Sequence, residues 1–204
     1  MSTTARPAQR AVMSRPLRAD AQRNYQALLT AASAAFADHG ADDVSLEEIA
    51  RRAGVGIGTL YRHFPARRDL LAAVYTDQVE ALRVRADELL ESGPPDQALA
   101  TWLRAVVDFG RTKRNLSTAL LASFDKESEL LSSCSAIMRE SAAALLRAAQ
   151  QDGTVRADAS AADVLRLVHA ISMAIERAPA DDGQADRLIA LVIDGLRYQG
   201  AGPQ

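Results

Sequence analysis

Apolar side chains recur every three or four positions along most of the chain, which is the spacing of helices with one buried face. Glycine, proline and short polar runs separate several of these segments. No segment shows the strict alternation that indicates a half-buried strand. The chain is therefore predicted to be all-α with about nine helices, at residues 20–38, 45–53, 56–64, 66–91, 96–112, 114–124, 127–151, 159–178 and 184–198.

The segment from Ser45 to Phe64 predicts two short helices joined by a tight turn. Ser45 can accept a hydrogen bond from the backbone N–H of Glu48, whose side chain can reach back to cap Ser45. Gly54 stands where the first helix ends, and Pro65 prevents the second helix from continuing. Two short helices around a glycine-containing turn form a helix-turn-helix.

The second of these helices has the side chains of a recognition helix. Leu60 and Phe64 are predicted to face inward, while the other positions carry groups that can reach phosphate oxygens or base edges. The glycines from 54 to 58 could alternatively form a phosphate-binding loop, but such a loop follows a buried strand and here a helix precedes it. A DNA-binding helix is therefore predicted, with Thr59, Tyr61, Arg62 and His63 outward.

Residues 20 to 70 resemble the DNA-binding domain of TetR-family transcriptional regulators. The matching motifs are A-x-x-x-F-x-x-x-G at 32–40, I-A-x-x-A-G-V at 49–55 and T-L-Y-x-H-F at 59–64. The resemblance implies that Thr59 and Tyr61 touch bases or adjacent phosphates, and that His63 and Arg67 touch phosphates. Ser45 matches a polar residue that can also reach phosphate.

Two departures from the family pattern weaken any prediction of direct base reading. Glu47 stands where some members place an arginine that reads a base, and the run Gly56-Ile57-Gly58 offers few side chains for this purpose. Specificity could instead depend on Arg51, Arg62, the N-terminal segment or DNA shape. The candidate DNA-binding residues are Ser45, Arg51, Thr59, Tyr61, Arg62, His63 and Arg67.

The net charge of −2 conceals an asymmetry between the two ends of the chain. Residues 1–68 contain ten arginines and six acidic residues, a balance of +4, and the remainder carries −6. A basic end joined to an acidic body favours nucleic-acid binding at one end, although arginines can also merely solubilise a helical surface.

We expect the chain to have three parts. These are a disordered basic arm at 1–18, either following the DNA or idle, a helix-turn-helix domain at 19–66, and a helical effector-binding and dimerisation domain at 67–204.

The last two predicted helices are apolar on more than one face, so both faces need covering. One face can meet the core of the domain and the other a partner, although a fully internal pair of helices is the alternative. The TetR resemblance also implies a homodimer formed through these helices as a four-helix bundle. The candidate interface residues are Val168, Ile175, Leu188, Leu191, Val192 and Leu196.

The middle helices contain large or soft side chains that, by resemblance to the family, could line a cavity for a small-molecule effector. Each of them could equally be core filler. The candidate ligand-binding residues are Trp102, Phe109, Phe124, Cys134, Met138, His169 and Met173.

Catalytic chemistry is not predicted. The three histidines, at 39, 63 and 169, fall in separate elements, and the single thiol of Cys134 has no basic neighbour on its helical face. We expect no cofactor, no metal, no membrane segment and a cytoplasmic location.

The sequence thus predicts a one-component transcriptional repressor that binds palindromic double-stranded operator DNA as a homodimer and is released by an unknown small-molecule effector. Two alternatives remain. The first is a DNA-binding dimer without an effector, controlled by a protein partner. The second is a helical binding or enzymatic domain that keeps the helix-turn-helix only as scaffold.

Overall fold

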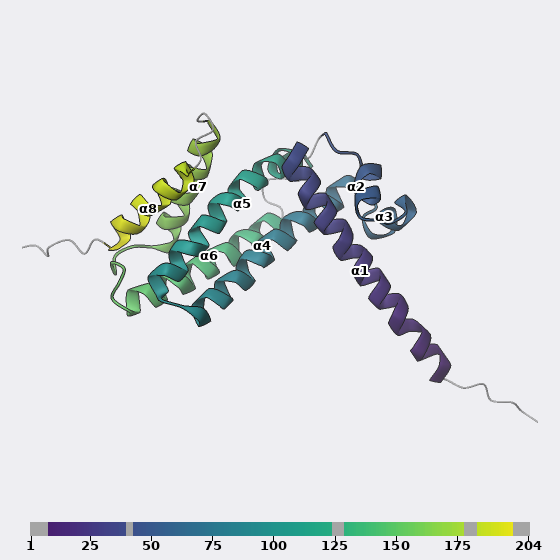
Figure 1. Ribbon diagram of the computed structural model, residues 1–204, viewed down its shortest axis with the longest axis horizontal. Helices are drawn as coiled ribbons and strands as arrows, with labels where there is room; N and C mark the ends of the chain where they lie inside the picture. Colours follow the sequence, from purple (N-terminus) through teal and green to yellow (C-terminus); the bar gives the residue numbers. More distant parts are fainter. Residues whose placement is uncertain (1–7, 40–42, 124–128, 178–182, 198–204) are drawn as a thin grey trace, which may run out of the picture. The chain divides into compact units, whose positions relative to one another are not determined.

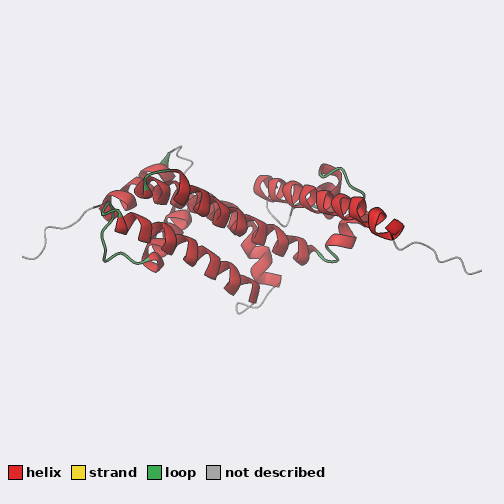
Figure 2. Cartoon of the chain, turned by 90° about the horizontal axis from the view of Figure 1, so that it is seen from below, coloured by secondary structure: helices red, strands yellow, loops and turns green. Residues whose placement is uncertain are grey.

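The computed structural model describes residues 8–39, 43–123, 129–177 and 183–197 (Figure 1). The described segments are helices joined by short loops, without a strand (Figure 2), so the all-α prediction is confirmed. The helices are α1 (Ala8–His39), α2 (Leu46–Arg52), α3 (Ile57–His63), α4 (Arg67–Ser92), α5 (Pro95–Ser123), α6 (Glu129–Gln151), α7 (Ala161–Arg177) and α8 (Gln184–Arg197).

Eight helices occupy the described residues, compared with about nine predicted. The difference arises in α5, which continues through the predicted break between residues 112 and 114. The residues at this point, Arg111, Thr112 and Lys113, include neither proline nor glycine. A helix continues through such residues because none of them removes a backbone donor or strongly favours another conformation.

Helix α1 begins at Ala8, well before the start predicted at Asp20. The disorder expected for residues 1–18 stays a prediction, and residues 1–7 lie outside the described part of the chain. Most residues of the segment, such as alanine, arginine and glutamine, are good helix formers, but Pro16 lies among them and removes one backbone donor. Extending an existing helix also needs no new nucleation, so this segment can be helical without an apolar stripe of its own.

The chain divides into two compact units, residues 1–74 and 75–204. This division falls inside α4, whereas the predicted boundary between domains lay at the start of that helix. In the first unit, α1, α2 and α3 pack against one another. Their shared core consists of fully or nearly fully buried side chains, including Leu28, Phe36, Ile49, Leu60 and Phe64.

The turn between α2 and α3 requires a glycine. Gly54 has φ +69°, a conformation that side chains with a Cβ rarely adopt. The backbone N–H of Gly54 donates to the carbonyl of Arg51 at 3.1 Å, and that of Val55 donates to the carbonyl of Ala50 at 3.0 Å. These two bonds form a Schellman motif, which satisfies carbonyl groups at the end of α2 and sets the direction of the chain into α3.

In the second unit, α5 lies against α6, α7 and α8. Trp102 of α5 is fully buried, and its indole N–H donates to the carbonyl oxygen of Leu82 in α4 at 2.8 Å. Two ion pairs join α5 to α8 at the surface, between Arg104 and Asp186 at 2.9 Å and between Arg197 and Asp96 at 2.5 Å. The core of this unit is therefore built around α5.

Replacing Gly54 with alanine should destabilise the protein by about 1 to 2 kcal/mol, because the left-handed backbone conformation is strained for any residue with a Cβ. No atom lies within 4 Å of the added Cβ, so the effect would come from the backbone alone. The measurement is the midpoint of urea unfolding. Gly58→Ala is the matched control, because it lies inside α3 with open space around it and should stabilise by up to about 1 kcal/mol. Equal midpoints for Gly54→Ala and the unmodified protein would contradict this account.

Candidate DNA-binding surface and ligand pocket

Helix α3 has one buried side and one exposed side. Leu60 and the following Phe64 are buried against the core of the first unit, as the sequence predicted. Tyr61 is 45% exposed, Arg62 is also exposed, and Thr59 and His63 are half-buried. Apolar burial thus fixes the helix on one side and presents polar groups on the other.

Hydrogen bonds and ring contacts restrict the side chains of α3. The guanidinium of Arg62 donates to the carbonyl of Gly58 and to Oγ1 of Thr59, each at 3.2 Å. His63 contacts Tyr25 of α1 edge-on, with ring centroids 5.8 Å apart. The Tyr25 ring also lies 5.2 Å from that of Phe64. These contacts hold Arg62 along the helix and His63 beside α1.

Ser45 caps the start of α2 as predicted, and its hydroxyl accepts from the backbone N–H of Glu48 at 3.1 Å. The predicted return contact from Glu48 to Ser45 is not formed between these described residues. The carboxylate of Glu48 instead accepts from Nε of Arg51 at 3.0 Å and from Nε of Arg52 at 2.8 Å. The hydrogen bond from Arg51 has the larger effect and that from Arg52 the next, and both lower the pKa of the Glu48 carboxyl below its usual value. The hydrogen bond to Glu48 in turn raises the pKa of the Arg52 guanidinium.

Arg67 lies at the start of α4, where a positive charge meets the positive end of the helix dipole. Its Cζ atom lies over the Phe36 ring, 5.9 Å from the centroid, in a cation–π arrangement. Asp69, in the same turn, accepts from the backbone N–H of Ala66 at 2.9 Å. The negative charge of Asp69 offsets the unfavourable placement of Arg67 and Arg68, so this helix start is stable without a bound anion.

A cavity of about 300 Å³ lies in the second unit, among α4, α5, α6 and α7. The ring centroids of Tyr75 and Phe109, two of the residues that line it, are 5.7 Å apart. Burial raises the pKa of Tyr75 to about 12, so its phenol is neutral at physiological pH. The described residues that line it are Tyr75, Val106, Phe109, Gly110, Ser132, Ser135, Met138, Arg139, Leu165, His169 and Ser172.

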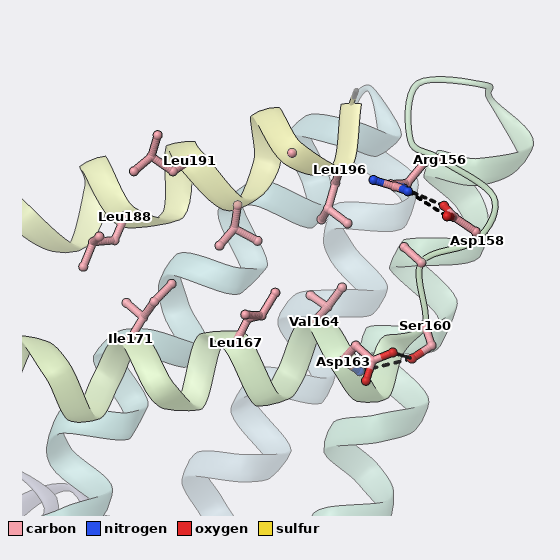
Figure 3. A pocket seen from close by; sticks show the side chains of 13 residues that line it. Arg156, Asp158, Ser160, Asp163, Val164, Leu167, Ile171, Leu188, Leu191 and Leu196 are labelled. Carbon is pink, nitrogen blue, oxygen red and sulfur yellow. Dashed lines mark hydrogen bonds and ion pairs between the residues drawn. The ribbon is translucent and has the colours of Figure 1, made fainter. Parts of the chain in front are cut away.

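A second, more open hollow of about 560 Å³ lies between α7, α8 and residues 156–160. We call it the α7–α8 groove. Figure 3 shows Leu167 and Ile171 of α7 and Leu188 of α8 pointing into the space between the two helices. Leu191 points away from α7 and is 68% exposed, while Leu167 is 53% exposed. This surface leaves large apolar side chains in contact with water.

Family comparisons identify both units. A model of bacterial regulatory proteins of the tetR family matches residues 28–74. A model described as transcriptional regulator SbtR-like, C-terminal domain, matches residues 94–198, which is half of the chain. The chain belongs to the TetR family. Because TetR regulators are DNA-binding transcription factors, the protein is a DNA-binding regulator and not an enzyme.

Individual TetR relatives agree with this assignment. The crystal structure of a TetR regulator from Streptomyces coelicolor is 35% identical and covers 86% of this chain and 99% of its own, with a TM-score of 0.75. An uncharacterised helix-turn-helix regulator of Mycobacterium tuberculosis is 34% identical over 63% of this chain and 68% of its own length. A TetR-like regulator of Mycobacterium smegmatis, solved with proflavine, shares the fold at 24% identity, with a TM-score of 0.59 over 85% and 96% of the two chains.

The cavity in the second unit is lined by three of the seven residues predicted as ligand contacts, namely Phe109, Met138 and His169. Trp102 and Cys134 are buried outside this lining, Met173 is exposed on α7, and Phe124 lies outside the described residues. His169 is exposed. The sequence reasoning missed Tyr75 and Arg139. Helical spacing could have revealed the polar members, since positions 132, 135 and 139 share a face of α6, as do 165, 169 and 172 of α7.

The predicted interface residues of this TetR chain fall into two groups. Leu191 is exposed, and Leu188 and Val192 line the α7–α8 groove with partial exposure. Val168 is fully buried in the core of its own unit. Ile175 packs partly against the same core, and Leu196 is 7% exposed.

No described helix is both long and apolar enough to cross a membrane. Among the described residues, no three His, Cys, Asp or Glu side chains gather in a way that could hold a metal ion.

Glu48→Gln should lower the thermal unfolding midpoint at pH 7, and the loss should shrink at pH 3. The reason is that the folded-state pKa of Glu48 is lowered, so its contribution is complete above its unfolded value near 4.5 and disappears as the pH falls through the folded value. Glu47→Gln is the matched control, since it removes the same charge from the same helical turn without breaking an ion pair with Arg51 or Arg52. An equal loss for both variants at pH 7 would refute a specific role for the Glu48 pairs.

Proposed function

We propose that the protein is a one-component repressor that binds a palindromic operator as a homodimer and releases it when a small molecule occupies the cavity. The observation that carries this proposal is the two-sided helix α3, whose buried Leu60 leaves Tyr61 and Arg62 exposed on the opposite side. A helix exposed in this way can enter the major groove of DNA. As DNA is its partner, the protein would act in the cytoplasm.

The proposed DNA contacts divide by chemistry. Tyr61, Arg62 and Thr59 lie on α3, from which they can reach bases and nearby phosphates. Ser45 and Arg67 begin α2 and α4, and backbone N–H groups at helix starts favour phosphate. Arg51 and Arg62 each have intramolecular partners, so both would exchange or share these hydrogen bonds on binding.

The α7–α8 groove supports the proposed homodimer. Leu167 and Leu191 are large apolar side chains that lie mostly in contact with water. Exposed apolar surface of this kind marks an interaction site, and two copies meeting through α7 and α8 would cover it with the same surface of the partner. A dimer would also present two copies of α3 to a palindrome whose half-sites lie about one helical turn, roughly 34 Å, apart.

The cavity supports control by a small molecule. The regulator from Mycobacterium smegmatis with a similar fold was solved with proflavine, which supports a small-molecule site in this chain as well. For an effector to release DNA, it must prefer the conformation that binds DNA poorly. DNA binding must then weaken effector binding by the same factor, because the two equilibria are linked.

Arg67→Ala should weaken binding to every DNA sequence by a similar factor and reduce the salt dependence of binding by about 0.9 log units per log unit of salt, the contribution of one phosphate contact. Fluorescence anisotropy with operator and scrambled duplexes at several salt concentrations measures both effects. Thr59→Ala should reduce the preference for the operator instead, and Arg147→Ala, in the second unit, should change neither. An unaltered salt dependence for Arg67→Ala would rule out its phosphate contact.

Leu191→Glu should convert the dimer to monomers, because a buried charge without a partner opposes association. The monomer itself should stay folded, since Leu191 is already exposed to water. Light scattering during size-exclusion chromatography measures the mass, and circular dichroism checks the fold. Leu90→Glu, at another exposed leucine, is the matched control and should remain dimeric. A dimeric Leu191→Glu protein would show that the interface lies elsewhere.

A further inference from the structure

The cavity in the second unit has an apolar part and a polar part that differ in exposure. Tyr75 and Val106 are buried, and Phe109, Met138 and Leu165 are half-buried. In contrast, Ser132, Ser135, Arg139 and His169 are exposed. A ligand that fits this distribution has an apolar body in the enclosed part and a polar group toward the water.

The described residues that line the cavity carry charge of one sign. Arg139 is positively charged, and these residues include no Asp or Glu. Nε of Arg139 donates to the carbonyl of Ser135 at 3.3 Å, and no carboxylate of the described residues pairs with this arginine. The planar guanidinium keeps further donors in the geometry that a carboxylate accepts in pairs.

The remaining polar groups can also serve an anion. The hydroxyls of Ser132 and Ser135 lie on the same face of α6 as Arg139, at intervals of three and four residues. These hydroxyls can donate to a negatively charged oxygen. Ser172 is different, because it is buried and its hydroxyl already donates to the carbonyl of Val168 at 3.0 Å.

The apolar wall favours a compact hydrocarbon body. The Tyr75 and Phe109 rings lie at 36° to each other and present aromatic surface to the cavity. Across α5 and α7 the cavity is closed by tight packing, since a Cβ on Gly110 would lie 2.6 Å from Oγ of Ser172. At the packing density of a protein interior, about 300 Å³ holds a ligand of about 10 to 15 non-hydrogen atoms.

We infer that the effector of this regulator is a small amphipathic carboxylate, with its hydrocarbon body against Tyr75 and Phe109 and its carboxylate at Arg139. This inference rests on the proposed function, because it names the chemical class of the molecule that the cavity takes. A cationic ligand would meet repulsion from Arg139, and a neutral ligand of the same shape would forgo the charge-assisted hydrogen bonds.

The test compares three compounds with one hydrocarbon body, namely phenylbutyrate, phenylbutanamide and phenylbutylamine, in titration calorimetry with the full chain. Phenylbutyrate should bind about five- to tenfold more tightly than the amide, a factor limited by the exposure of Arg139, and the amine should bind most weakly. Arg139→Gln should remove the preference for the carboxylate over the amide. Arg147→Gln, on the same helix but outside the cavity, should keep it.

A second variant separates the body of the ligand from its charge. Phe109→Leu should weaken all three compounds by a similar factor and leave their order unchanged. Equal or tighter binding of the amide or amine, an unaltered preference in Arg139→Gln, or no binding of any compound at millimolar concentration would each overturn the proposed effector class. Thermal unfolding confirms that each variant is folded.

Anisotropy with operator DNA separates this inference from the proposed function. Specific DNA binding without binding of phenylbutyrate would overturn the effector class and leave the regulator intact. Binding of phenylbutyrate with the expected dependence on Arg139, but without any specific DNA binding, would support the carboxylate site and count against a repressor. Release of operator DNA by phenylbutyrate, absent in Arg139→Gln, would support both.

Discussion

Burial of Leu60 and Phe64 in the core of the first unit is the constraint on which the DNA-binding surface depends. A helix of seven residues is too short to be stable alone, so α3 exists because its apolar side is held by α1 and α2. The same burial decides which side chains remain outside. Tyr61 and Arg62 are presented to solvent because the helical repeat places them away from Leu60.

The polar contacts of the first unit orient side chains on a backbone that apolar burial already holds in place. Glu48 holds two arginines, and Asp69 offsets the charge of the arginines that begin α4. Both groups are exposed or half-buried, and surface ion pairs contribute little to stability. Under the proposed function they would also act on DNA binding, because the Arg51 charge would reach a phosphate only by sharing or leaving Glu48.

The second unit contains two hollows, the cavity and the α7–α8 groove, and their linings differ in polarity. The cavity mixes aromatic side chains with Arg139, a distribution that suits an amphipathic ligand. The α7–α8 groove is almost wholly apolar between the helices, a distribution that suits a protein surface of the same kind. The separation of the two follows from α7, whose face toward the cavity carries His169 and Ser172 while its face toward α8 carries Leu167 and Ile171.

The sequence by itself determined the helical class, the Gly54 turn, the inward face of α3 and the two apolar faces of α7 and α8. These features follow from local rules, since capping, glycine conformation and helical periodicity act within a few residues. Only the tertiary structure decided that Val168 faces its own core and that Tyr75 joins Arg139 around one cavity. Periodicity identifies a buried face but not the helix that covers it, because that choice depends on contacts between distant segments of the chain.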